Sequence, residues 1–124
     1  MATIVYKEVH EQRLFVKWFY LEYPNEKIAA FCNGGKRTAL QTKLLIYEGL
    51  LPGICDLIIL TPKYPYHSLF LEMKRTKGGV ISKEQKDMIL HLKSKHYKAE
   101  VSKGWEVARD ITLEYMSLPD WRYE

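Results

Sequence analysis

Two strand-like segments joined by a proline-containing loop set the strongest limit on the fold of this chain. Residues 56–60 form a short apolar run rich in β-branched side chains, and residues 68–74 alternate along their length. Residues 61–67 between them contain two prolines, which are unfavourable inside a sheet. We therefore predict two strands and a connecting loop. In the second strand the side chains divide between two faces: Leu69, Leu71 and Met73 on one, and Phe70, Glu72 and Lys74 on the other.

Helices are predicted before and after this pair. Apolar side chains recur at helical spacing between residues 7 and 22, and Pro24-Asn25 predicts the end of that helix. Ser82, with Gln85 three residues later, has the pattern of a capping box at the start of another helix. The other expected elements are strands at 28–32 and 97–101 and helices at 38–48 and 105–116. This order predicts an α/β fold with a mixed central sheet flanked by helices.

Size and composition indicate a single domain over residues 1–124. A hydrophobic content of 47% suffices for one core, and the chain is too short for two ordinary domains. The apolar runs are too short to span a membrane, and the N-terminus lacks the pattern of a signal peptide. We therefore expect a soluble, cytoplasmic protein. Cys32 and Cys55 are too few for a disulfide framework, and we expect both to be buried free thiols.

Positive charge is concentrated in the second half of the chain. Between residues 74 and 103 there are nine Lys or Arg and three Asp or Glu, whereas the whole chain has a net charge of +4. A basic block of this kind suits a polyanionic partner such as nucleic acid. A lysine-rich face that is merely solvated has the same composition, so charge alone leaves both interpretations open.

Two acidic residues and one lysine are placed to meet at one end of the predicted strand pair. Glu72 and Lys74 are two apart on a strand and share a face, and Asp56 begins the preceding strand. If these strands form a hairpin, Asp56 and Glu72 come close together, and adjacent carboxylates favour a cation between them. Mg²⁺ or Mn²⁺ could there activate a water for phosphodiester hydrolysis. The alternative is that Glu72 and Lys74 lie on a solvent-facing strand edge.

The sequence around these residues resembles one nuclease family. Gly53-Ile54-Cys55-Asp56 followed by Glu72-Met73-Lys74 is similar to the PD-(D/E)xK nuclease signature. Over about residues 8–108 the order of motifs resembles the VRR-NUC family, in its stand-alone, phage-type members. The further motifs are His10-Glu11-Gln12, Asn33-Gly34-Gly35-Lys36-Arg37, Glu48-Gly49-Leu50-Leu51-Pro52-Gly53, Glu72-Met73-Lys74-Arg75 and Ser82-Lys83-Glu84-Gln85. One position departs from the family, because Cys55 stands where proline is usual.

The resemblance implies a restriction-endonuclease-like core and a role for each residue at the centre of the motif. Asp56 and Glu72 are implied to bind the metal directly, and the backbone carbonyl of Met73 is implied as a further ligand. Lys74 is implied to activate or orient the attacking water. The proline that Cys55 replaces shapes the backbone and supplies no ligand, so the replacement bears on the geometry at Asp56 and not on the ligand set.

Two more site residues are implied on the helices. Glu11 would reach the metal from the first helix, directly or through water, and Gln85 would support the site from the third helix. Glu11 falls on the apolar face of its helix, where a carboxylate needs a partner. The alternatives are an exposed first-turn glutamate that interacts with the helix dipole and a glutamine that only completes the capping box.

The motif loops also carry the expected contacts to DNA. Basic side chains there could hold phosphates without reading sequence, and glycines could let the backbone approach a strand closely. Any single lysine could equally be a solvated surface residue. The candidate DNA-binding residues are Asn33, Gly34, Gly35, Lys36, Arg37, Lys43, Arg75, Lys77 and Lys83.

The resemblance implies a metal-dependent endonuclease that cuts branched DNA as a homodimer, similar to a Holliday-junction resolvase, and a phage-encoded origin would fit it. Symmetric cutting of a four-way junction needs two centres related by a two-fold axis. Candidate interface aromatics are Tyr64, Tyr66, Trp121 and Tyr123. The alternatives are a flap, nicking or general DNase without junction preference, and an inactive DNA-binding module. The intact Asp56, Glu72 and Lys74 argue against the inactive module.

Overall fold

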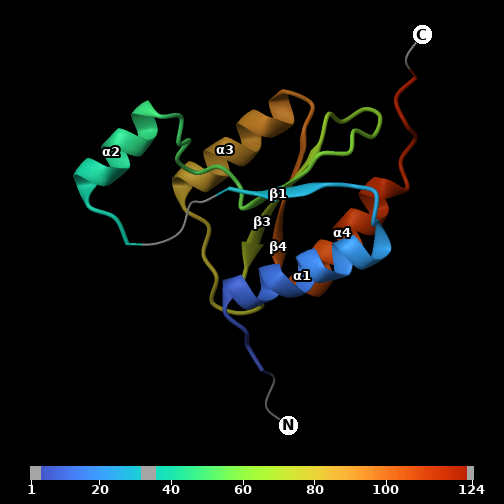
Figure 1. Cartoon of the computed structure of the whole chain (residues 1–124), viewed down its shortest axis with the longest axis horizontal. Coiled ribbons are helices and arrows are strands. Elements are labelled where there is room, and N and C mark those ends of the chain that lie inside the picture. Colours follow the sequence, from blue (N-terminus) through green and yellow to red (C-terminus); the bar gives the residue numbers. More distant parts are fainter. Residues whose placement is uncertain (1–3, 32–35, 123–124) are drawn as a thin grey trace.

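A computed structural model describes residues 4–31 and 36–122 of the chain. Within these residues the helices and strands follow the predicted order, and their ends differ from the predictions by one or two residues (Figure 1). The elements are α1 (Glu8–Glu22), β1 (Ile28–Ala30), α2 (Ala39–Tyr47), β2 (Leu57–Ile59), β3 (Leu69–Lys74), α3 (Lys83–Ser94), β4 (Lys98–Lys103) and α4 (Trp105–Met116).

The strands form one mixed sheet in the order β1-β2-β3-β4. The pairs β1–β2 and β2–β3 are antiparallel, whereas β3 and β4, which α3 connects, are parallel. The hairpin expected between residues 56–60 and 68–74 is confirmed, with Leu57 opposite Leu71. β3 has a strand on each side, and it is buried along its whole length.

Helices cover both faces of this sheet, so the predicted α/β layering is confirmed (Figure 1). On one face α1 and α4 pack over a core of Phe15, Phe19, Leu57, Ile59, Leu69, Leu71, Met73, Ala108 and Tyr115. On the other face α3 packs over Ile54, Cys55, Phe70, Ile89, Leu92 and Ala99. The division of alternate β3 side chains between two faces therefore follows the predicted pattern. No helix in the described residues combines the length and apolarity needed to cross a membrane.

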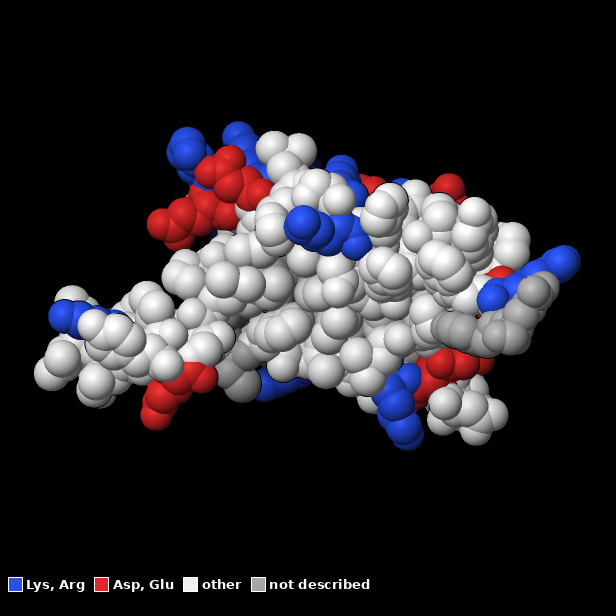
Figure 2. All heavy atoms as spheres, turned by 90° about the horizontal axis from the view of Figure 1, so that it is seen from above, with Lys and Arg blue, Asp and Glu red and all other residues white. Residues whose placement is uncertain are grey.

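Helix α2 stands apart from these layers. None of its residues is buried, and it projects from one end of the molecule (Figure 1). Leu40, Leu44, Ile46 and Tyr47 are between 44% and 75% exposed. In Figure 2 this projection, at the left, is almost entirely white, with few charged groups. A helix that is apolar on most sides is normally buried against other parts of a protein or against a partner.

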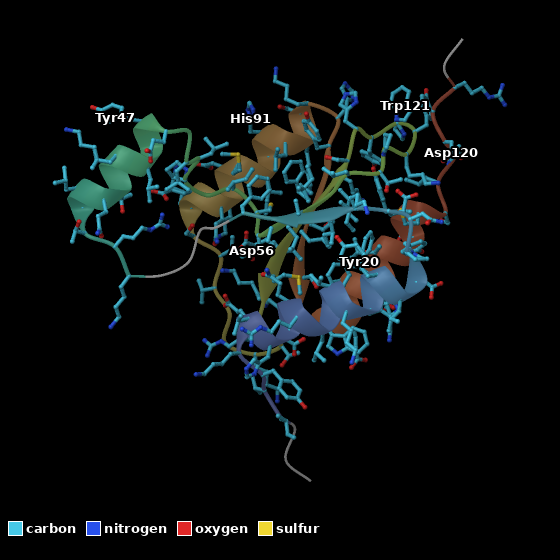
Figure 3. All side chains as sticks on the ribbon, viewed as in Figure 1. Tyr20, Tyr47, Asp56, His91, Asp120 and Trp121 are labelled. Carbon is cyan, nitrogen blue, oxygen red and sulfur yellow. The ribbon has the colours of Figure 1, made fainter. Side chains whose placement is uncertain are left out.

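Trp121, near the end of the described chain (Figure 3), packs against aromatic residues of the loop between β2 and β3. Tyr66 packs against the core under α1 and α4, and the Trp121 indole N–H donates a hydrogen bond to the Tyr66 carbonyl at 2.9 Å. Tyr64 lies edge-on to Trp121 and is 54% exposed. Contacts within the domain therefore account for Tyr66 and Trp121, which the sequence offered as interface candidates. Tyr123 lies outside the described residues.

Candidate active site

The pairing of β2 with β3 brings Asp56 beside Glu72. Leu57 lies opposite Leu71, so one step further along this antiparallel pair Asp56 faces Glu72. The Met73 backbone N–H donates a hydrogen bond to Asp56 Oδ2 at 2.8 Å, which fixes the orientation of that carboxylate. Asp56 lies toward the middle of the molecule, on the side from which α2 projects (Figure 3). The predicted convergence of the two carboxylates is confirmed.

Glu72 and Lys74 are both buried in the central strand. Their residues are 2% and 8% exposed, and Lys74 Nζ lies 3.6 Å from Glu72 Oε1. The interpretation of these two residues as a solvent-facing strand edge is therefore wrong, since β3 is flanked by β2 and β4. A buried ion pair generally contributes little net stability, because removing two charges from water offsets their attraction. A buried pair of this kind therefore marks a candidate functional site.

The surroundings of Glu72 favour its protonated form and raise its pKa to about 8. Burial is the largest cause, followed by the negative charge of Asp56, while Lys74 acts in the opposite direction. Two carboxylates this close resist being ionised together unless a cation lies near both. The pair therefore favours a positive charge close to it, with Glu72 shielded from water and Asp56 half-buried.

The donor atoms suit a hard divalent cation. Glu72 Oε2 is buried without a hydrogen-bond partner in the part of the chain that the structure describes. Among those residues no group of three His, Cys, Asp or Glu side chains could hold a metal. Mg²⁺ commonly takes one or two carboxylates and fills its other positions with water and substrate oxygens. Asp56 and Glu72 thus fit an open site for Mg²⁺ or Mn²⁺, to which the Met73 carbonyl could add one oxygen.

Gln85 joins the start of α3 to the site. Its side-chain Oε1 accepts a hydrogen bond from the Ser82 backbone N–H at 3.0 Å, while its own backbone N–H donates to Ser82 Oγ at 3.1 Å. This capping box confirms the prediction for Ser82. The other end of the same side-chain amide, Nε2, donates to Glu72 Oε1 at 2.9 Å. The two interpretations of Gln85 are therefore compatible, because a primary amide can accept at one end and donate at the other.

Glu11 is buried, at 2% exposed, and its carboxylate accepts a hydrogen bond from the Trp105 backbone N–H. This places it at the N-terminus of α4, where a negative charge is favourable. The Gly104 N–H next to it donates to the Lys74 carbonyl at 2.9 Å. The interpretation as an exposed first-turn glutamate is wrong. Within the described structure Glu11 is linked to the main chain of Lys74 only through Gly104, and its contact with a metal remains a prediction.

Cys55 is fully buried and lies close to the two carboxylates. Burial raises the pKa of its thiol to about 12, with the charges of Glu72 and Asp56 as further causes. The thiol is thus neutral at physiological pH and packs as a small apolar group in the core under α3. The prediction of a buried free thiol is confirmed for Cys55, while Cys32 lies outside the described residues.

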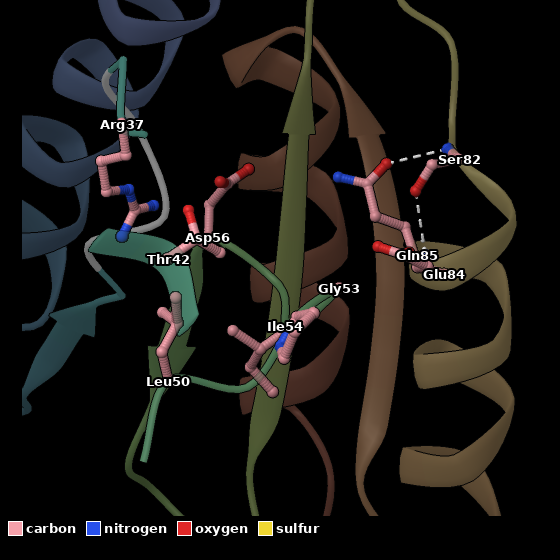
Figure 4. A pocket seen from close by; sticks show the side chains of 10 residues that line it. Arg37, Thr42, Leu50, Gly53, Ile54, Asp56, Ser82, Glu84 and Gln85 are labelled. Atoms are coloured by element: carbon pink, nitrogen blue, oxygen red, sulfur yellow. Dashed lines mark hydrogen bonds between the residues drawn. The ribbon is translucent and has the colours of Figure 1, made fainter. Parts of the chain in front are cut away.

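A cavity of about 270 Å³ opens beside Asp56 (Figure 4). Its walls come from the start of α2, the loop before β2 and the start of α3, through Arg37, Thr42, Leu50, Pro52, Gly53, Ile54, Ser82, Glu84 and Gln85. A Cβ at Gly53 would lie 2.7 Å from the Glu84 carbonyl oxygen, so this close approach of the loop to α3 requires glycine. Leu50 belongs to the motif at residues 48–53, whereas no motif marks Thr42, which only the packing of separate segments brings here.

The described candidate DNA-binding residues lie on several segments of the chain, and one of them lines this cavity. Arg37 lines it, and Lys36 and Lys43 are exposed near or on α2. Arg75 and Lys77 are exposed in the loop after β3, and Lys83 pairs with Asp87 at 2.9 Å. On the face shown in Figure 2, basic and acidic groups are interspersed and form no continuous basic surface. Asn33, Gly34 and Gly35 lie outside the described residues.

Comparison with known proteins agrees with this geometry. The family model of the VRR-NUC domain matches residues 3–106. A solved structure titled "VRR_NUC domain protein" superposes with a TM-score of 0.79 and 21% sequence identity, covering 98% of this chain and 96% of that chain. No curated protein matches the chain. The structural likeness shows a shared fold, and the family model spans most of the sequence. The chain therefore belongs to the VRR-NUC family, whose domain is a nuclease of the PD-(D/E)xK type.

Proposed function

We propose that this chain is a metal-dependent DNA endonuclease that cuts branched DNA, in the manner of a Holliday-junction resolvase. The observation that carries the proposal is the pairing of half-buried Asp56 with buried Glu72, whose Oε2 is left without a partner in the described residues. Lys74, 3.6 Å from Glu72, completes a set of groups suited to phosphodiester hydrolysis.

Each residue of this set has a proposed part in the reaction. Asp56 and Glu72 hold Mg²⁺ or Mn²⁺, with the Met73 carbonyl as a further ligand. When bound, the ion supplies Lewis-acid stabilisation of the phosphate and lowers the pKa of a water molecule. The Lys74 ammonium orients the attacking water or a phosphate oxygen, because it is the nearest fixed positive charge to Glu72.

Gln85 and Glu11 have supporting parts. The amide of Gln85 holds one oxygen of Glu72, which leaves the other oxygen directed to the ion. Glu11 supports the end of β3 through Gly104 and the Lys74 carbonyl, and could reach the ion through water. Phosphate contacts are proposed for the described basic residues in or beside the motif loops, which are Lys36, Arg37, Lys43, Arg75, Lys77 and Lys83.

The proposed homodimer has support from α2. This helix carries one charged residue, Lys43, among nine and buries none of its side chains within the chain. An apolar groove, which includes Phe31, Leu45 and Leu51, continues from it toward the sheet. A second copy of the same helix is a fitting partner, because a two-fold interface brings equal apolar surfaces together.

Cleavage of a panel of DNA shapes tests the proposal. Labelled four-way junction, splayed-arm, flap and linear duplex DNA would be incubated with Mg²⁺, Mn²⁺ or EDTA. Glu72→Gln and Lys74→Met test the site. Glu100→Gln and Lys98→Met are matched controls, since Lys98 and Glu100 are also two apart on a strand, form an ion pair at 3.1 Å and have side chains about one-third exposed. Calorimetric titration with Mn²⁺ gives a readout that does not depend on activity.

We expect paired cuts in the junction that disappear with EDTA. Glu72→Gln should lower the cleavage rate by about a thousandfold or more and abolish Mn²⁺ binding, whereas both controls should cut normally. Equal cutting of all shapes would overturn the junction preference and leave a nicking or general DNase. DNA binding without cutting, with either metal, would overturn the catalytic assignment in favour of a DNA-binding module.

A further inference from the structure

The loop between β3 and α3 has features that the metal-binding pair does not require. It follows Lys74 directly and ends at Ser82, the N-cap of α3 (Figure 1). From residue 74 to residue 83 the chain carries four basic residues and no acidic residue. Val80 within this loop is 80% exposed, more than any other large hydrophobic side chain in the described residues.

Close packing of Gly79 fixes this loop next to the site. A Cβ at Gly79 would lie 3.0 Å from Lys74 Cβ and 3.3 Å from the Arg75 backbone nitrogen. The backbone one residue before Val80 therefore rests directly on the lysine of the site. Val80 is consequently held within one residue of a contact with Lys74, which belongs to the proposed site.

Two further contacts hold the first half of the loop. The Arg75 guanidinium donates a hydrogen bond to the Gly78 carbonyl at 3.4 Å, and Gly78 adopts a φ of +80°. Thr76 packs so closely against Gly104 that a Cβ there would lie 2.7 Å from Thr76 Cγ2. The start of the loop thus packs against the residue that precedes α4, and a hydrogen bond within the loop restricts the backbone at Gly78.

Val80, an apolar side chain among basic residues, is suited to a partner that has both phosphates and an apolar surface. The basic residues attract phosphates, whereas an apolar group gains free energy only by leaving water. In nucleic acids the apolar surface is the face of a base, which stacking hides in an intact duplex and a branch exposes. Aliphatic side chains are known to insert between base steps that are easily unstacked.

Building on the nuclease function proposed above, we propose that Val80 contacts an unstacked base beside the scissile phosphate and so determines the preference for branched over linear DNA. Arg75 and Lys77 hold the flanking phosphates irrespective of shape. Val80 is accordingly a specificity-determining residue, distinct from the residues that bind the metal.

To detect unstacking, 2-aminopurine would be placed at the branch of a splayed-arm DNA, because its fluorescence rises when this base unstacks. EDTA would be present so that the DNA is not cut during the measurement. Affinities for splayed-arm and linear DNA would be measured in parallel, followed by cutting rates with Mg²⁺. The variants are Val80→Ala and Lys77→Ala. Leu90→Ala is the control, because Leu90 is also strongly exposed, at 66%, but lies on α3 outside the loop.

We expect wild type to raise the fluorescence and Val80→Ala to reduce that rise, with the preference for splayed-arm DNA about fivefold smaller. Lys77→Ala should weaken both DNAs alike and lower the salt dependence of binding. Leu90→Ala should match wild type. An unchanged preference in Val80→Ala, an equal loss in Leu90→Ala, or a changed oligomeric state in Val80→Ala would overturn the proposal.

The two proposals fail in different ways. If wild type unstacks and prefers the branch and Val80→Ala loses that preference, but no DNA is cut with either metal, the nuclease proposal is overturned and the contact of Val80 with an unstacked base stands. If wild type cuts DNA but neither unstacks the branch nor prefers it, the role of Val80 is overturned and the nuclease proposal stands.

Discussion

Glu72 combines burial in the central strand, an unpartnered oxygen within the described structure and a pKa raised to about 8. Each property has a physical cause in its neighbours. The strands beside β3 exclude water, Gln85 occupies one carboxylate oxygen, and Asp56 adds negative charge. A residue in this environment destabilises the fold when ionised alone and is stabilised by a cation.

This environment predicts that the protein without bound metal loses stability as pH rises. A glutamate side chain ordinarily has a pKa of 4.5, whereas that of Glu72 in the folded protein is about 8, so between these values the folded state binds more protons than the unfolded state. The free energy of unfolding in EDTA should therefore fall across this window, by up to roughly 3 kcal/mol between pH 4.5 and pH 7. Urea denaturation at a series of pH values measures the effect.

Glu72→Gln should remove this pH dependence, because its amide does not titrate, and should be more stable than wild type in EDTA at pH 8. Glu100→Gln, on the partly exposed pair of β4, should keep the wild-type dependence. The same slope in wild type and Glu72→Gln would show that Glu72 is ionised throughout and would contradict the assignment.

At the level of helices and strands, the start of α3 serves both folding and the site. Ser82 and Gln85 satisfy backbone groups that the first turn of a helix leaves unpaired. Gln85 then extends to Glu72 from this fixed position. The close approach of Gly53 to the backbone of Glu84 sets the distance between α3 and the loop that leads into Asp56. The capping of one helix thereby orients a side chain on β3.

Substituting the two capping residues one at a time should show which of them affects only stability and which also affects cleavage. Ser82→Ala removes one capping hydrogen bond and should lower the free energy of unfolding by about 1 kcal/mol, with cleavage nearly unchanged. Gln85→Ala loses the contact to Glu72 as well and should lower kcat by about tenfold. Thermal unfolding and single-turnover cleavage measure the two effects. Equal losses of kcat in both variants would mean that Gln85 acts only as a cap.

Considered as a whole molecule, the chain has a layered core and one helix outside it. The sheet and the helices α1, α3 and α4 enclose two cores, whereas α2 leaves large apolar side chains in water. Tyr47, the last residue of this helix, lies at its upper end in Figure 3. Since α2 begins beside the cavity that contains Asp56, whatever covers it also lies next to the site.

If α2 forms the dimer interface, a single charge introduced on this helix should separate the two subunits. Leu44→Glu should convert a dimer to a monomer, because a carboxylate would be buried without a partner at the interface. Leu21→Glu is the control, since Leu21 is even more exposed, at 75%, but lies on α1. Analytical ultracentrifugation measures the mass. Wild type that sediments as a monomer, or equal dissociation of both variants, would reject this interface.

Local sequence patterns were sufficient for the order of elements, the capping box at Ser82 and the alternation along β3. These features depend on residues within a few positions of one another, so periodicity and turn chemistry predict them. Asp56 and Glu72 could be brought together with one further assumption, that their strands form a hairpin. The residues at the centre of the site were therefore accessible from the sequence.

The tertiary structure alone decided the partners of Glu11, the second contact of Gln85 and the isolation of α2. Glu11 accepts its hydrogen bond from a backbone N–H of α4, a donor that almost every residue has and that no motif can mark. The apolar pattern of α2 is the same whether the helix is buried or projects, because periodicity records apolar spacing and not what covers it. Contacts between distant segments depend on how the elements pack, and that information lies outside any local window of the sequence.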